Sequence, residues 1–68
     1  MSHPTTAAVY AFIQAYLAKH PYAPTVREIA TGCHLAPSSV FYHLDRLEAA
    51  GHIQREPGVS RGLFLPEG

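Results

Sequence analysis

Apolar positions in the first third of the chain recur with the period of a helix. One helix face is marked by apolar residues at i, i+3, i+4, i+7 and i+8, namely Val9, Phe12, Ile13, Tyr16 and Leu17. Thr5 or Thr6 can cap the start of this helix, and Pro21 and Pro24 prevent its continuation. The pattern predicts a helix over about residues 5–20 that packs one side on a core.

A shorter helix is predicted over about residues 25–32. Thr25 and Glu28 have the spacing of a capping box, in which each side chain accepts a hydrogen bond from the other residue's amide. The apolar side of this helix consists of Val26, Ile29 and Ala30. Residues 32–35 are predicted to form a turn.

The third predicted helix covers about residues 37–50. Pro37 suits the first turn, where its missing N–H has no helical partner, and Gly51 suits the left-handed position that stops a helix. If Val40 points inward, the inner side also includes Leu44 and Leu47 and, to a lesser degree, His43 and Ala50. The outer side then carries Ser38, Tyr42, Asp45 and Ala49, with Ser39 and Arg46 on one flank and Phe41 on the other.

The chain then changes from helical to extended character. Two short stretches rich in aliphatic residues, 52–56 and 62–65, flank the segment Pro57-Gly58-Val59-Ser60-Arg61. This arrangement predicts a β-hairpin, or wing, over about residues 52–65. The expected fold is mostly α with a small β-hairpin: a three-helix winged helix-turn-helix that forms one domain over residues 1–68.

Composition limits the possible functions. A chain of 68 residues with 47% hydrophobic and 15% charged residues is expected to form one small globular domain without room for an enzyme cleft. The apolar runs are too short to span a membrane, and no export signal is evident. The single cysteine, Cys33, fits a reducing cytoplasm and is expected to be a buried, inert thiol. We therefore expect a cytoplasmic protein.

The outer face of the third helix is the best candidate for chemistry. Its hydroxyls, its phenol and Arg46 suit reading of base edges in a DNA major groove. One alternative is a solvated face whose aromatics shield the edge of the core. The main rival is a protein-interaction surface, because Phe41 and Tyr42 form an exposed aromatic pair.

Three arginines outside this helix bear on the same question. Arg27, in the first turn of the second helix, opposes the helix dipole unless a DNA phosphate docks there, although a plain surface arginine is an equal alternative. Arg61, at the wing, is the best single candidate for a phosphate or minor-groove contact. Arg55 is expected to face Glu56 or solvent.

Several classes of site are not supported. His20, His34, His43 and His52 lack a cysteine partner and a close ligand pair, so no metal site is expected. No catalytic arrangement and no phosphate-binding glycine loop occurs, and no cofactor or small-molecule site is evident. Five Lys/Arg against five Asp/Glu give no net charge, so any attraction to DNA must come from the placement of charges. We expect a binding protein rather than an enzyme.

The combined pattern resembles the bacterial winged helix-turn-helix repressor superfamily. The residues that carry it are Ile29-Ala30, Cys33, Leu35, Ser38-Ser39-Val40, His43-Leu44, Leu47-Glu48, Gly51 and Ile53. Within this superfamily, Ala23-Pro24-Thr25, Arg27-Glu28-Ile29-Ala30 and Ser60-Arg61-Gly62 are similar to the N-terminal DNA-binding domain of LexA-type repressors.

The resemblance implies that the third helix reads the major groove while the wing touches the DNA backbone or minor groove. It would place Ser38, Ser39, Phe41 and Tyr42 at the bases and Arg61 at the backbone. The chain departs from the pattern at His34 and Ala36, and it carries no Ser-Lys peptidase residues, so self-cleavage is not expected of it. We expect a repressor-like regulator that binds double-stranded DNA as a homodimer on an inverted repeat. The alternative is a winged-helix module that binds proteins and not DNA.

Overall fold

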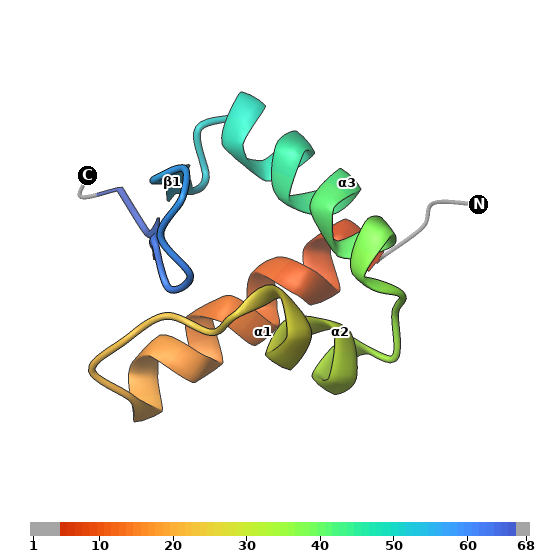
Figure 1. The fold of residues 1–68 in the computed structure, drawn as a ribbon, viewed down its shortest axis with the longest axis horizontal. Helices are drawn as coiled ribbons and strands as arrows, with labels where there is room; N and C mark the ends of the chain where they lie inside the picture. The colour runs from red at the N-terminus through yellow and green to blue at the C-terminus, as the bar shows by residue number, and fades with distance from the viewer. Residues whose placement is uncertain (1–4, 67–68) are drawn as a thin grey trace.

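A computed structural model describes residues 5–66 of the chain. It contains three helices, α1 (Thr5–Lys19), α2 (Val26–Cys33) and α3 (Pro37–Ala49). Two strands follow, β1 (Gln54–Arg55) and β2 (Leu63–Phe64), and they pair antiparallel. Figure 1 shows α1 passing behind the other elements, with α2 and α3 in front of it and the hairpin beside α3. The predicted fold class, three helices with a small β-hairpin, is confirmed.

The core is apolar and draws on every helix. Its buried members are Val9, Ile13, Ala23, Ile29, Ala30, Val40, Leu44, Leu47, Ile53 and Leu63. Each fully buried Val, Leu or Ile side chain stabilises the fold by roughly 1.5–3 kcal/mol relative to the same side chain exposed to water. The prediction that Ala50 faces the core is wrong, because α3 ends at Ala49 and Ala50 is exposed. His43 is half-buried and its Nδ1 lies 2.6 Å from the Thr6 hydroxyl.

Local interactions set the boundaries of α2. Both hydrogen bonds of the predicted capping box are present: Thr25 N–H to Glu28 Oε1 at 2.8 Å, and Glu28 N–H to Thr25 Oγ1 at 3.1 Å. The helix extends to Cys33, one residue beyond the predicted end, and His34 then adopts the left-handed conformation with φ of 57°. The left-handed residue turns the chain sharply into α3, as in other helix C-terminal caps.

The two ends of α3 differ in how they are capped. Ala36 is the N-cap residue and, having no side-chain oxygen, makes no side-chain capping bond to the amides of the first turn. Pro37 is the first helical residue, as predicted. At the other end Gly51 has φ of 82°, which confirms the predicted left-handed stop.

The start of α1 differs from the prediction that Thr5 or Thr6 caps it. Both threonines lie within α1, so neither is at the position that precedes the helix.

The wing is mostly loop. Gln54 pairs with Phe64 and Arg55 with Leu63, so each strand has two residues and is shorter than the predicted stretches. The Glu56 amide still donates to the Gly62 carbonyl across the hairpin at 2.6 Å, but the Gly62 amide donates to the Val59 carbonyl within the loop at 3.1 Å, so the antiparallel ladder ends there. These bonds close residues 56–62 into one compact unit.

No helix within residues 5–66 is long and apolar enough to cross a membrane.

Candidate nucleic-acid interface

The turn between α2 and α3 leaves one side of α3 open to solvent. Four of the predicted site residues on this helix are exposed: Ser38, Phe41, Tyr42 and Arg46. Ser39 is half-buried. The opposite side of the helix holds Val40, Leu44 and Leu47 in the core, so the exposed side cannot rotate inward without exposing them. All five predicted residues of α3 are thus accessible to some degree.

Tyr42 is held by its neighbours on α3. Its ring is met edge-on by the His43 ring, with 5.1 Å between the ring centroids. One helical turn later, the central guanidinium carbon of Arg46 lies 5.7 Å from the Tyr42 ring centroid. The Tyr42 residue nevertheless stays 57% exposed. The result is a phenol and a cation presented together on the outer face of the helix.

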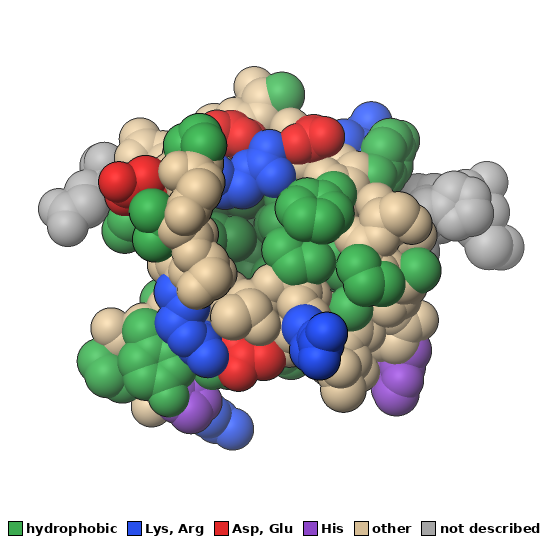
Figure 2. Space-filling model, viewed as in Figure 1, with side chains coloured by type: hydrophobic (Ala, Val, Ile, Leu, Met, Phe, Trp, Pro, Cys, Tyr) green, Lys and Arg blue, Asp and Glu red, His purple; other side chains and the backbone are tan. Residues whose placement is uncertain are grey.

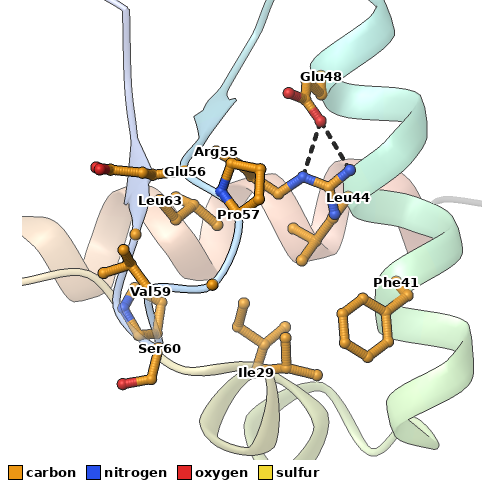
Figure 3. A pocket seen from close by; sticks show the side chains of 14 residues that line it. Ile29, Phe41, Leu44, Glu48, Arg55, Glu56, Pro57, Val59, Ser60 and Leu63 are labelled. Atoms are coloured by element: carbon orange, nitrogen blue, oxygen red, sulfur yellow. Dashed lines mark hydrogen bonds and ion pairs between the residues drawn. The ribbon is translucent and has the colours of Figure 1, made fainter.

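Phe41 points in a different direction from Tyr42. It lines a cavity of about 360 Å³ between α2, α3 and the wing loop. Figure 3 shows Ile29 and Leu44 at the helix side of this cavity, with Pro57, Val59 and Ser60 of the loop on the opposite side. Phe41 is 52% exposed and Val59 51% exposed. The cavity therefore has apolar edges from both the helix and the wing.

Arg27 is exposed at the second residue of α2. Within residues 5–66 it takes part in no ion pair, whereas the next residue, Glu28, does. Arg27 is therefore available to an external anion beside the start of α2.

Arg61 is not free at the wing. Its Nη1 lies 3.0 Å from Glu28 Oε1, its Nη2 lies 3.2 Å from Glu28 Oε2, and Nη1 also donates to the Ala23 carbonyl at 2.8 Å. Its guanidinium carbon lies 4.6 Å from the Tyr22 ring centroid. The Arg61 hydrogen bond is the main reason that the pKa of Glu28 falls to about 2, with the Thr25 amide adding to the effect. The partner that sequence reasoning missed is Glu28, to which only the capping role was assigned.

Arg55 is also paired, contrary to the prediction that it faces Glu56 or solvent. From β1 it forms ion pairs with Asp45 and Glu48 of α3, the latter at 2.7 Å from Nη2. Figure 3 shows the Glu48–Arg55 bonds above the cavity. These hydrogen bonds raise the pKa of Arg55, although partial burial acts in the opposite direction. Asp45 and Glu48 share a helix face because they are three residues apart, a signal that could have identified this partner.

Ion pairs within the chain occupy some of its charged side chains and leave others available. Two of the five Lys/Arg, at positions 55 and 61, are bound to carboxylates of this chain. Within residues 5–66 the cations outside any ion pair are Lys19, Arg27 and Arg46, and the corresponding acidic residue is Glu56. Figure 2, which has the same view as Figure 1, shows basic and acidic side chains beside each other, with hydrophobic side chains between these charged groups. The unpaired charge of the described chain is therefore positive.

Within residues 5–66 the histidine and cysteine side chains do not gather in one cluster. His20 stacks on Tyr22 with 5.4 Å between ring centroids, and His52 lies at the same distance from Tyr10. Among residues 5–66, no group of three His, Cys, Asp or Glu side chains is arranged to hold a metal ion. Cys33 is half-buried rather than buried, and this burial raises the pKa of its thiol.

Comparison with known proteins gives a consistent result. The family model described as the LexA DNA binding domain matches residues 4–62. The chain is similar to a LexA repressor of Carboxydothermus hydrogenoformans, 45% identical over 58 residues, which cover 84% of this chain and 28% of that protein. It is similar to a LexA repressor of Geotalea uraniireducens, 48% identical over 65 residues, 91% of this chain and 31% of that protein. A LexA repressor of Thermotoga maritima is 40% identical over 57 residues, 84% of this chain and 29% of that protein. The chain thus spans 28–31% of the length of these relatives.

Proposed function

The chain belongs to the family of LexA DNA-binding domains, and from this membership we propose that it binds double-stranded DNA sequence-specifically as a repressor of transcription. In this proposal α3 lies in the major groove and the tip of the wing lies on the DNA backbone. This is the general docking arrangement of helix-turn-helix proteins, in which the second helix of the unit meets the base edges.

The observation that carries the proposal is the exposed side of α3. Ser38, Ser39 and Tyr42 present hydroxyl groups, Phe41 presents an apolar ring, and Arg46 presents a cation. Hydroxyls and arginine recognise base edges or phosphates, whereas an apolar side chain can contact the methyl group of thymine. We assign base contacts to Ser38, Ser39, Phe41 and Tyr42 and phosphate contacts to Arg27 and Arg46.

The distribution of charge supports the same proposal. A chain with no net charge can still bind DNA if its charges are unevenly placed. The affinity for DNA comes from the cations that reach phosphates. Here Asp45, Glu48 and Glu28 are paired with arginines of the wing. Among residues 5–66, Arg27 of α2 and Arg46 of α3 take part in no ion pair.

Two copies on an inverted repeat would complete the recognition. One recognition helix reads a few base pairs, which gives limited specificity, and two-fold symmetric sites are the usual solution for this class of domain. The relatives are repressors, and we extend that role, together with a cytoplasmic location on the nucleoid, to this chain as part of the proposal.

A salt titration of DNA binding tests the proposal. After selection of a preferred site from random duplexes, the affinity is measured between low and physiological salt. With phosphate contacts from Arg27 and Arg46, we expect log K to fall with log salt by a slope of about −2 for each bound copy. Absence of binding at low salt would refute DNA binding. It would favour the second candidate, a protein-interaction module, which the exposed Phe41, Tyr42 and Val59 suggest.

A further inference from the structure

Arg61 lies where three segments of the chain meet. Its guanidinium bonds Glu28 of α2 and the Ala23 carbonyl of the connection before α2, and its Nη1 lies 3.4 Å from the hydroxyl of Tyr16 in α1. The side chain belongs to the wing loop, which is 33 to 45 residues away in sequence from these partners. Arg61 therefore links the wing loop to the helical part of the fold.

The acceptor for Arg61 is held in place by a local contact at the start of α2. The carboxylate of Glu28 is held by the Thr25 amide, a contact between residues three positions apart that forms with the helix itself. One oxygen of this carboxylate accepts from both Thr25 and Arg61, and the other accepts from Arg61 alone. A paired arginine–carboxylate contact through two oxygens fixes direction as well as distance.

The loop transmits the position of Arg61 to the rest of the wing. Arg61 precedes Gly62, whose amide and carbonyl close the loop onto Val59 and Glu56. A Cβ atom at Gly62 would lie 2.9 Å from the Glu56 carbonyl oxygen, so the chain crosses itself closely at this point. With only two residues in each strand, backbone pairing alone is too weak to orient the hairpin. Side-chain contacts with the rest of the fold add to it: Leu63 packs in the core, and Arg55 and Arg61 bond carboxylates of α3 and α2.

We propose that Arg61 is a positioning residue that sets the wing at the correct distance from α3 for DNA binding, and that it does so without neutralising a phosphate. This inference rests on the DNA-binding function proposed above. The two hydrogens of Nη1 already face three acceptors, from Glu28, Ala23 and Tyr16, and the carboxylate counters the positive charge. Within residues 5–66 the hydrogen bonds of Arg61 leave the Nε hydrogen and one Nη2 hydrogen for a phosphate, and the adjoining Glu28 carboxylate would repel that phosphate.

The test compares Arg61→Ala with Glu28→Gln. A glutamine at position 28 keeps an oxygen acceptor for the capping box but loses the charge and one of the two acceptors of Arg61. Both variants are measured on the selected site in two forms: a full duplex, and a duplex trimmed to the base pairs that α3 covers. Circular dichroism and melting curves establish that each variant is folded at the assay temperature. Glu28→Gln decides the question if Arg61→Ala does not fold.

We expect both variants to lose affinity for the full duplex by about three- to tenfold, the size typical of a networked ion pair. The slope of log K against log salt should not change in either. On the trimmed duplex, which the wing does not reach, the loss should disappear. The double variant should bind no worse than Arg61→Ala, because both changes break the same contact.

Three outcomes overturn the inference. A slope that falls by about one unit in Arg61→Ala, with unchanged or higher affinity in Glu28→Gln, would make Arg61 a phosphate contact. Equal losses on the full and trimmed duplexes would make the contact a general stabiliser of the fold. Wild-type affinity in both variants would show that the Arg61–Glu28 contact plays no part in DNA binding. In contrast, a wild-type chain that binds neither duplex at low salt would refute the proposed function itself.

Arg27→Ala provides the matched control. Arg27 is an exposed arginine on the same helix as Glu28, and it lies outside the ion pairs of residues 5–66. If Arg27 contacts a phosphate, its removal should lower the salt slope by about one unit on both duplexes. The control shows that the assay detects a lost phosphate contact when one exists.

Discussion

The guanidinium group of Arg46 lies over the ring of Tyr42, with 5.7 Å between its central carbon and the ring centroid. The two residues are four positions apart and therefore neighbours on the exposed side of α3. A cation over an aromatic ring at an exposed site contributes about 0.5–1 kcal/mol. The pair restricts the orientations of the Tyr42 ring and so limits the directions in which its hydroxyl can reach a base.

Tyr42→Ala should reduce affinity for the preferred DNA site by about 1–3 kcal/mol, the range for one good base contact. The loss on random DNA should be smaller, because backbone contacts remain. Tyr42→Phe is the matched control: it keeps the ring beside Arg46 and removes only the hydroxyl. Binding isotherms on both DNAs measure the difference. Equal losses on preferred and random DNA would show that Tyr42 does not discriminate between bases.

Cations of two kinds should respond differently to neutralisation. Arg46→Ala removes a charge on α3 that lies outside the ion pairs of residues 5–66, and it should lower the salt slope by about one unit. Arg55→Ala removes a charge already bound to Asp45 and Glu48, so the slope should stay the same while thermal stability falls. Affinity measured over a series of salt concentrations, together with melting curves, separates the two effects. A lower slope in Arg55→Ala would mean that its ion pairs open on DNA.

Ala36→Ser should stabilise the fold. Ala36 already has the extended backbone of an N-cap, with φ of −72° and ψ of 150°, but lacks an oxygen for the free amides of the first turn. A serine hydroxyl at such a position contributes about 0.5–2 kcal/mol. Chemical denaturation measures the gain, and Ala36→Gly is the control for changes of backbone entropy. A serine variant no more stable than the wild type would contradict the capping argument.

The contribution of Glu28 to stability should depend on pH. Its pKa falls from the usual 4.5 to about 2 in the folded protein, so the folded state holds the proton less tightly than the unfolded state. The stabilisation is therefore fully present above about pH 4.5 and is lost as the pH falls towards about 2. Melting curves of the wild type and Glu28→Gln should differ most above pH 5 and converge near pH 2. A constant difference across this range would rule out linkage through the Glu28 carboxylate.

The helices could be predicted because their signals are local. The capping box of Thr25 and Glu28 spans three residues, and Gly51 marks the end of α3 by its own conformational freedom. The outer side of α3 followed from the helical period once Val40 was taken as buried. Ala50 was misplaced because the period was extended past Ala49, where the helix stops.

The partners of the arginines could not be predicted in the same way. Arg61 and Glu28 are 33 residues apart, and no periodic pattern connects a loop residue with a helix residue. An arginine that is expected to be exposed can bind a carboxylate of its own chain or a phosphate of DNA. The packing of the wing on the helices decides between these two partners. Sequence patterns give the residue types that are available for binding, but not which of them are already occupied.

The brevity of β1 and β2 has a consequence for the order in which parts of the molecule open. Four strand residues make few backbone bonds, so detachment of the hairpin from the helices breaks little backbone pairing, although it exposes Leu63 of the core. The amides of Glu56 and Gly62 should then exchange with solvent deuterium far faster than those of α1, which exchange only on global unfolding. DNA that holds the wing in place should slow the exchange of these two amides more than any other. The lifetime of the wing's own contact with DNA would then be limited by the opening of the hairpin.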